Sequence, residues 1–272
     1  MKKILVSLLC LFAVSIQVNA ATWCAKDRVP AVGQQLLTKN KINVKITFKV
    51  VDGVADNSDS AKTNIVNVSL NNLQYAGNDN EVAAVVADEL GHIICCHTDK
   101  AKVRNLILAN SGASSDAASN TIADDIISSK ITQKENEEAD VTAVNLMINA
   151  GYNPLALIVW VTKQPGSTLD VLKSRPNNFD RAMVTYKYLS YAYPSKVKAG
   201  YGCQEYRAFL TDAELVMQKL TKNKRKLAKF NKEQEKLIKE RQKDLEKYKL
   251  IGGLNSWGVT YDWLTTTENQ SK

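Results

Sequence analysis

The segment at residues 81–97 constrains the fold and function of this chain more than any other part of it. It is rich in Ala, Val and Ile and follows Asn-Asp-Asn at 78–80, residue types that cap helices, so it predicts a helix. Asp88 and His92 are four residues apart and share a helix face, with Glu89 beside them. This is the layout of the His-Glu-x-x-His zinc helix, in which the Glu activates a metal-bound water, except that an Asp replaces the first His.

Elsewhere the pattern of apolar residues predicts a mainly helical α+β chain with a small sheet. Apolar and polar residues alternate over 42–50, and a second short strand is predicted at 64–70. Residues 109–130 are rich in Ser, Ala, Asn and Asp with little periodicity, which indicates a loop or lid. Further helices are predicted at 133–150, 154–163, 178–193 and 205–250, the last a single long charged helix that Gly252-Gly253 closes.

Three motifs resemble those of one enzyme family. Residues 81–97 are similar to the zinc helix of the HtpX/BepA-type metallopeptidases, gluzincins that also include the CAAX prenyl protease and typically read Glu-x-Ala-Ala-Val-x-Ala-His-Glu-x-Gly-His. Asn-Glu-Glu-Ala-Asp at 136–140, with Ala-Gly-Tyr-Asn-Pro at 150–154, resembles the family's second motif, Glu-x-Glu-Ala-Asp before a helix that ends in Ala-Gly-Tyr-Asp-Pro. Ser-Arg-Pro at 174–176, with Arg181, resembles its later Ser-His-Pro-x-x-x-x-Arg. The resemblance covers roughly residues 40–190 and implies a zincin-like (gluzincin) domain.

The resemblance also implies roles for individual residues. Glu89 corresponds to the general base and Asp140 to a supporting carboxylate, while His92 keeps the identity of a zinc ligand. The family's first and third zinc ligands correspond to Asp88 and Asn136. The strand along which such enzymes lay an extended substrate corresponds to Asn64, Ile65, Val66, Asn67 and Val68.

These replacements predict a weakened metal site. An Asp carboxylate is shorter than an imidazole and has to approach the metal more closely, and the neutral carbonyl of Asn136 is a poor zinc ligand. Glu135 or Glu137 would reach the third ligand position through a distortion of the helix, because each points about 100° away from Asn136. Arg175 stands where some family members have a metal-facing His, and its charge would repel a cation.

Other ligand sets near His92 have specific limits. Asp88, His92 and Cys96 form a stripe, but eight helical rises of about 1.5 Å separate its ends, so one ion does not bind all three. His92 and Cys96 remain two candidate ligands for another site. Otherwise Cys95 and Cys96 are expected to be buried apolar or disulfide-bonded residues, and His97 is expected to interact with the helix dipole.

The first twenty residues have the pattern of an export signal. Lys2-Lys3 precede an apolar stretch at 4–16, and Val-Asn-Ala at 18–20 matches a cleavage site. We expect cleavage near Ala20 and a periplasmic or secreted protein; a retained N-terminal anchor is the alternative. In an oxidising compartment, three full disulfide pairings are open, with a link from Cys24 or Cys203 to the adjacent Cys95-Cys96 pair favoured over a bond between those neighbours.

The net charge of +8 is concentrated in residues 215–250, which hold thirteen Lys and Arg against five Asp and Glu. The predicted peptidase-like part is therefore not basic. Residues 215–250 are interpreted either as a solvated helix or as a contact surface for an acidic partner or a membrane. Nucleic acid is disfavoured by the export signal and by the shortage of aromatic residues in the basic run.

The sequence thus predicts a signal peptide at 1–20, a gluzincin-like domain at 21–205 and a basic helical extension with an aromatic tail at 206–272. The favoured function is that of a metallopeptidase homologue with impaired or lost zinc endopeptidase activity, which retains a cleft for a polypeptide substrate or an envelope partner. The alternative is an active zinc endopeptidase in envelope protein quality control, with Asp88, His92 and a Glu at 137 around the metal.

Overall fold

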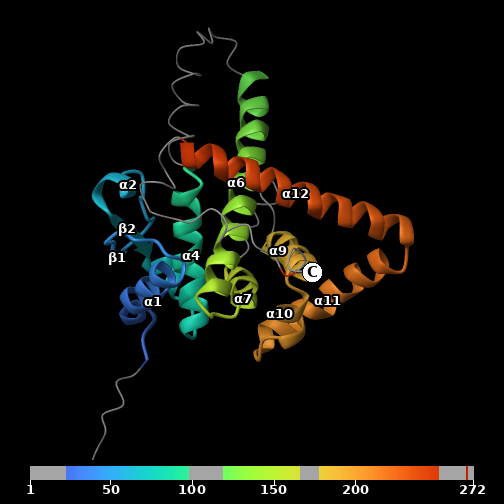
Figure 1. Cartoon of the computed structure of the whole chain (residues 1–272), viewed down its shortest axis with the longest axis horizontal. Coiled ribbons are helices and arrows are strands. Elements are labelled where there is room, and N and C mark those ends of the chain that lie inside the picture. The colour runs from blue at the N-terminus through green and yellow to red at the C-terminus, as the bar shows by residue number, and fades with distance from the viewer. Residues whose placement is uncertain (1–22, 98–118, 166–177, 251–267, 269–272) are drawn as a thin grey trace, which may run out of the picture.

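The computed structural model describes residues 23–97, 119–165, 178–250 and 268 (Figure 1). The predicted signal peptide, residues 109–118 of the predicted loop, the Ser-Arg-Pro motif, Gly252-Gly253 and the aromatic tail lie outside the described residues. The described part is mostly helical with one two-stranded sheet, which confirms the α+β class. None of its helices is long and apolar enough to cross a membrane.

Twelve helices and strands make up the described structure. In chain order they are α1 (Ala25–Lys39), β1 (Thr47–Val51), α2 (Ser60–Thr63), β2 (Ile65–Ser69), α3 (Leu70–Leu73), α4 (Asp79–Ile94), α6 (Ser119–Asn149), α7 (Leu155–Lys163), α9 (Asn178–Ala192), α10 (Pro194–Ala199), α11 (Gln204–Thr221) and α12 (Lys224–Leu250).

Helix α4 lies at the centre of the core. It packs against α1, α6, α7 and β2, and every residue of it from Glu81 to Asp88 is buried (Figure 1). Asn78 caps it, because its side-chain oxygen accepts hydrogen bonds from the backbone N–H groups of Asn80 and Glu81, as the sequence predicts. A helix that is buried on most sides can hold polar residues only where other elements supply partners.

Helices α4 and α6 cross at very close range. A Cβ atom on Gly91 would lie 2.7 Å from the backbone oxygen of Ala139, so no larger residue fits at this position without movement of one helix. This contact places one helical turn of α4, with Asp88 and His92, against the turn of α6 that carries Asp140. The small residues of the two motifs therefore set the distance between the helices.

The sheet consists of β1 and β2 in parallel, with Thr47 paired to Ile65 and Val51 to Ser69 at its ends. Val66 and Val68 on β2 are fully buried and face the core, while β1 packs against α1. Because β1 covers one edge of β2, the other edge is the one that faces the loop at residues 53–57.

Two sequence predictions are wrong at the C-terminal and middle parts of the chain. The predicted single helix at 205–250 is two helices, α11 and α12, because Asn223 accepts hydrogen bonds from the N–H groups of Arg225 and Lys226 and caps a new helix. The predicted loop at 109–130 is helical from residue 119, because α6 continues N-terminally from its packed half, and each added residue adds a backbone hydrogen bond. Helix α1 was not predicted at all.

Candidate functional site

The face formed by α4, α6 and α9 carries a buried ion-pair network. Arg181 on α9 donates to both carboxylate oxygens of Asp140, at 2.9 and 2.6 Å, and to Asp88 at 2.9 Å. Its guanidinium carbon lies 5.7 Å from the ring centroid of Trp160. Burial lowers the pKa of Arg181, but the charges of Asp140 and Asp88 outweigh burial and raise the pKa above its ordinary value. One arginine therefore neutralises part of the charge of two carboxylates.

Glu89 lies next to this network and contacts the sheet through Asn57. The side-chain amide of Asn57 donates at 2.9 Å both to Glu89 and to the backbone carbonyl of Asn67, and its oxygen accepts from the N–H of Asn67 at 2.8 Å. Burial, followed by the charge of Asp88, raises the pKa of Glu89 to about 8. At neutral pH Glu89 is consequently a neutral carboxylic acid.

His92 and His97 contact each other at the C-terminal end of α4. Their Nδ1 atoms are 2.8 Å apart, and Nε2 of His97 lies 3.1 Å from a carboxylate oxygen of Glu138 on α6. The nearest approach of His92 to Asp88 is 3.9 Å, too long for a hydrogen bond. Burial lowers the pKa of His92, with partial compensation by Asp88, so that its imidazole is neutral. His97 thus has specific side-chain partners, which the sequence did not predict.

A second buried cluster joins the end of α4 to helix α12. Arg241 on α12 is 6% exposed and donates through Nη2 to the thiol of Cys95 at 3.0 Å and to the hydroxyl of Thr142. Burial alone would raise the pKa of the Cys95 thiol, but Arg241 and His97 outweigh burial and lower it to about 7. Cys95, His97 and Glu138 each offer a ligand atom, and these atoms lie within 4.8 Å of one another. The three residues form a group that could hold a metal ion.

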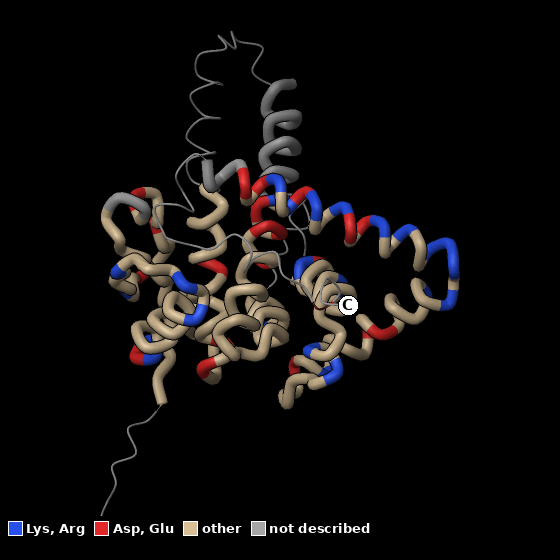
Figure 2. Tube along the Cα trace, in the orientation of Figure 1, with Lys and Arg blue, Asp and Glu red and all other residues tan. Residues whose placement is uncertain are grey.

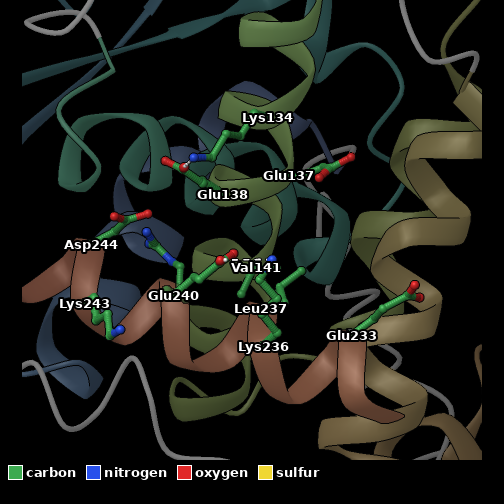
Figure 3. A pocket seen from close by; sticks show the side chains of 11 residues that line it. Lys134, Glu137, Glu138, Val141, Glu233, Lys236, Leu237, Glu240, Lys243 and Asp244 are labelled. Carbon is green, nitrogen blue, oxygen red and sulfur yellow. Dashed lines mark ion pairs between the residues drawn. The ribbon is translucent and has the colours of Figure 1, made fainter. Parts of the chain in front are cut away.

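The remaining candidate residues on α6 are Asn136 and Glu137. Asn136 is half-buried, one helical turn before Asp140 on the same face. Glu137 lines a cavity of about 510 Å³ between α6 and α12, together with Glu138 and Glu240 (Figure 3). Arg241 also lines this cavity. Burial raises the pKa of Glu137, and Gln133 donates a hydrogen bond to it at 3.3 Å. Glu137 thus borders this cavity, and its charge also raises the pKa of Asp140 in the neighbouring ion-pair network.

The zinc site that the family resemblance implies does not fit the donors of this chain. The carboxylate of Asp88 binds the guanidinium of Arg181, the amide of Asn136 is a weak zinc ligand, and His92 bonds through Nδ1 to His97. The cationic partner of Asp88 and Asp140 is thus supplied by the chain itself. We derive no catalytic step through zinc at these residues.

The four cysteines of the described part of the chain are free thiols: Cys24, Cys95, Cys96 and Cys203. Cys95 is fully buried and Cys96 nearly so, as expected for apolar cysteines. Cys95 lies beside His97, a neighbour that the sequence did not predict, while the chain leaves the helix after Ile94 and Cys96 adopts a positive φ of 54°.

Arg181, Asn57, Glu138 and Arg241 are site residues whose side-chain contacts the sequence analysis did not predict. Arg181 matches a family motif but had no assigned role, and the other three contact the site over 32 to 146 residues of sequence separation. No local pattern signals contacts over such separations.

Comparison with known proteins identifies no relative: no family model, curated protein or solved structure matches the chain.

Proposed function

We propose that this chain is a metallopeptidase homologue of the HtpX/BepA type that lacks zinc endopeptidase activity and binds extended polypeptide. The observation that carries the proposal is the bond between Arg181 and Asp88, which commits the residue at the first zinc-ligand position to an ion pair. The guanidinium of Arg181 thus occupies the side of the Asp88 carboxylate that would otherwise bind a metal.

The helix arrangement supports the zincin-like part of the proposal. Gly91 of the first motif and Ala139 of the second meet at the α4–α6 crossing, and Asp140 lies against the turn that carries Asp88. The two motifs are thus in contact through the residues that the resemblance aligns. Such contact is expected if the chain keeps the scaffold of the family after loss of its ligands.

The edge of β2 supports the polypeptide-binding part. Asn57 makes hydrogen bonds to both the N–H and the C=O of Asn67, the two backbone groups through which an added strand would pair. We propose that an extended polypeptide replaces the amide of Asn57 on this edge. Glu89, which also accepts from Asn57, would then lie beside the bound chain.

The loss of proteolysis is tested with unfolded casein and added zinc. We expect no cleavage by the wild-type chain and no difference in the Glu89→Gln variant. Cleavage that disappears in Glu89→Gln would contradict the proposal and establish the active endopeptidase instead.

A restoring variant tests the zincin scaffold directly. Asp88→His with Asn136→Glu should bind one zinc ion at least tenfold more tightly than the parent chain, measured by calorimetry in a Cys95→Ala background that removes the nearby thiol. Asp88→Asn with Asn136→Gln is the matched control, because it changes the same positions without adding strong ligands. Equal zinc affinity in the two double variants would show that the positions do not converge on a metal site.

Polypeptide binding at the edge of β2 is tested by fluorescence anisotropy with labelled, unfolded casein. Asn57→Ala should bind casein more tightly, by up to roughly tenfold, because the incoming chain no longer has to displace the amide. Asn71→Ala, at an exposed position on α3, is the control and should match the wild type. Equal affinity of Asn57→Ala and the wild type would place any binding elsewhere.

A further inference from the structure

The contact between α4, α6 and α12 combines three metal-ligand types in one buried cluster. Cys95 is fully buried, His97 is 5% exposed, and the side chain of Glu138 is 11% exposed. Their ligand atoms lie within 4.8 Å of one another, whereas the ligands of a tetrahedral zinc ion lie roughly 3.3–3.8 Å apart, given bonds of about 2.0 and 2.3 Å. A contraction of about 1 Å would bring all three atoms onto one ion.

Histidine geometry agrees with this role. Nε2 of His97 faces Glu138, and Nδ1 of His97 faces Nδ1 of His92. Ligating histidines usually hold their other ring nitrogen in a hydrogen bond, which sets the tautomer and the ring orientation. His92 fills that orienting position for His97, with ring centroids 4.9 Å apart.

A cation of the chain already contacts the thiol. The Nη2 atom of Arg241 lies 3.0 Å from Sγ of Cys95. The other terminal nitrogen of Arg241, Nη1, is buried and has no hydrogen-bond partner among the residues that the structure describes. Arg241 is thus held at this position by one of its two terminal nitrogens.

The neighbouring cavity provides a place to which Arg241 can withdraw. The cavity between α6 and α12 has a volume of about 510 Å³, and Arg241 forms part of its wall. Carboxylates of Glu233, Glu240 and Asp244 on α12 also line it. These acids can pair with a displaced guanidinium, so that the arginine need not become an unpaired buried charge.

We propose that Cys95, His97 and Glu138 form a binding site for a thiophilic divalent cation of the zinc class, and that Arg241 competes with the metal for Cys95. Its three ligands are not the residues that align with the family's zinc ligands, although His97 contacts one of these, His92, and the site does not depend on the proposed loss of peptidase activity. Metal binding draws Arg241 off the thiol and so links the end of α4 to the position of α12.

Cobalt(II) is the probe that distinguishes this site, because a thiolate ligand produces a sulfur-to-cobalt charge-transfer absorption that oxygen and nitrogen ligands do not. The full chain is titrated with Co²⁺ and then with Zn²⁺ under reducing conditions. We expect one cobalt ion per chain with the charge-transfer band, and displacement of cobalt by zinc. Absence of the band in both the wild type and Arg241→Met would overturn the proposal.

Matched variants assign the ligands. Cys95→Ala should abolish the band, Glu138→Gln should weaken zinc binding at least tenfold, and Arg241→Met should strengthen it. Cys96→Ala and Arg225→Met are the controls, because they remove a neighbouring buried thiol and an exposed cation of the same helix. Circular dichroism verifies that each variant folds. Binding that is lost in Asp88→Asn but retained in Cys95→Ala would move the metal to the other site and refute this one.

Discussion

Arg181 determines the electrostatics of the α4–α6 face at the scale of single residues. Its side chain bonds to Asp88 and to both oxygens of Asp140, and the side chain of Asp140 is 1% exposed. Removal of one member of such a buried network leaves the other charges without a partner. The resulting loss of stability is much larger than the net contribution of the ion pair to the free energy of unfolding. The contribution of Arg181 to the ion-pair network can therefore be measured as a change in the free energy of unfolding.

We expect Arg181→Met to lower the free energy of unfolding by about 3–5 kcal/mol, measured by urea denaturation. In the double variant Arg181→Met with Asp140→Asn, the loss should be smaller than the sum of the two single losses, because the second change removes the unpaired carboxylate. Strict additivity would mean that the two side chains do not interact in solution.

The raised pKa of Glu89 predicts a pH dependence of stability. The pKa is about 8 in the folded chain, against an ordinary value of 4.5, so the folded state binds the proton more tightly than the unfolded state. The stabilising contribution is complete below pH 4.5 and is lost as the pH rises through about 8. Glu89→Gln should flatten this decline in a comparison of urea denaturation at pH 5 and pH 8.5. If the free energy of unfolding falls by the same amount in the variant as in the wild type, the effect belongs to another group.

At the scale of elements, the α4–α6 crossing decides how the two motifs meet. Gly91 contacts the backbone of Ala139, which cannot rotate away as a side chain would. Helix positions at such a contact tolerate glycine because it lacks a Cβ atom. The crossing thus brings Asp88 of the first motif and Asp140 of the second into one polar cluster.

Gly91→Ala should consequently destabilise the chain by about 1–3 kcal/mol, since the added methyl group would force the helices apart. Gly202→Ala is the control, because a Cβ there meets nothing within 4 Å. Thermal unfolding of the two variants gives the comparison. A Gly91→Ala chain as stable as Gly202→Ala would show that the helices are farther apart in solution.

At the scale of the whole molecule, α12 folds back over the domain instead of extending from it. Phe230, Arg241 and Leu245 on α12 are buried, and α12 contacts α9 and α11. Basic residues lie along α12 and gather at the turn between α11 and α12, where Lys224, Arg225 and Lys226 are exposed (Figure 2). The basic charge is therefore presented on one long helix and its turn.

The membrane or acidic-partner role of residues 215–250 stays a prediction, which vesicle binding tests. The chain should sediment with vesicles that contain anionic phosphatidylglycerol, and less so at higher salt because screening shortens the range of the attraction. Lys224→Gln, Arg225→Gln and Lys226→Gln together should weaken binding severalfold. The control changes three exposed lysines elsewhere, Lys26, Lys39 and Lys45, to Gln. Equal losses in both triple variants would indicate a response to net charge alone.

Much of the fold could be predicted from local pattern. The helices at α4, α7 and α9 and strand β2 fall close to their predicted ranges, because periodicity, Asn78 as a cap and the Gly-x-x-Pro stop at 151–154 act over a few residues. Strand β1 begins at Thr47, five residues later than the predicted start at 42. The turn at Asn223 was missed because a single capping residue within a charged, helix-favouring run is a weak signal. The start of α6 was missed because low periodicity concealed a helix that continues from a packed segment.

The sequence by itself determined that Asp88, Glu89 and His92 share one helix and that Asp140 stands on another, because helical spacing depends on local backbone geometry. The tertiary structure alone decided the partners of these residues: Arg181 on Asp88 and Asp140, Asn57 on Glu89, and His97 on His92. Those contacts join residues brought together by the packing of α9, the loop before β2 and the end of α4. Whether a polar side chain binds a metal or an ion-pair partner depends on which group lies within bonding distance of it in the folded chain. The packing of segments that are far apart in the sequence sets those distances.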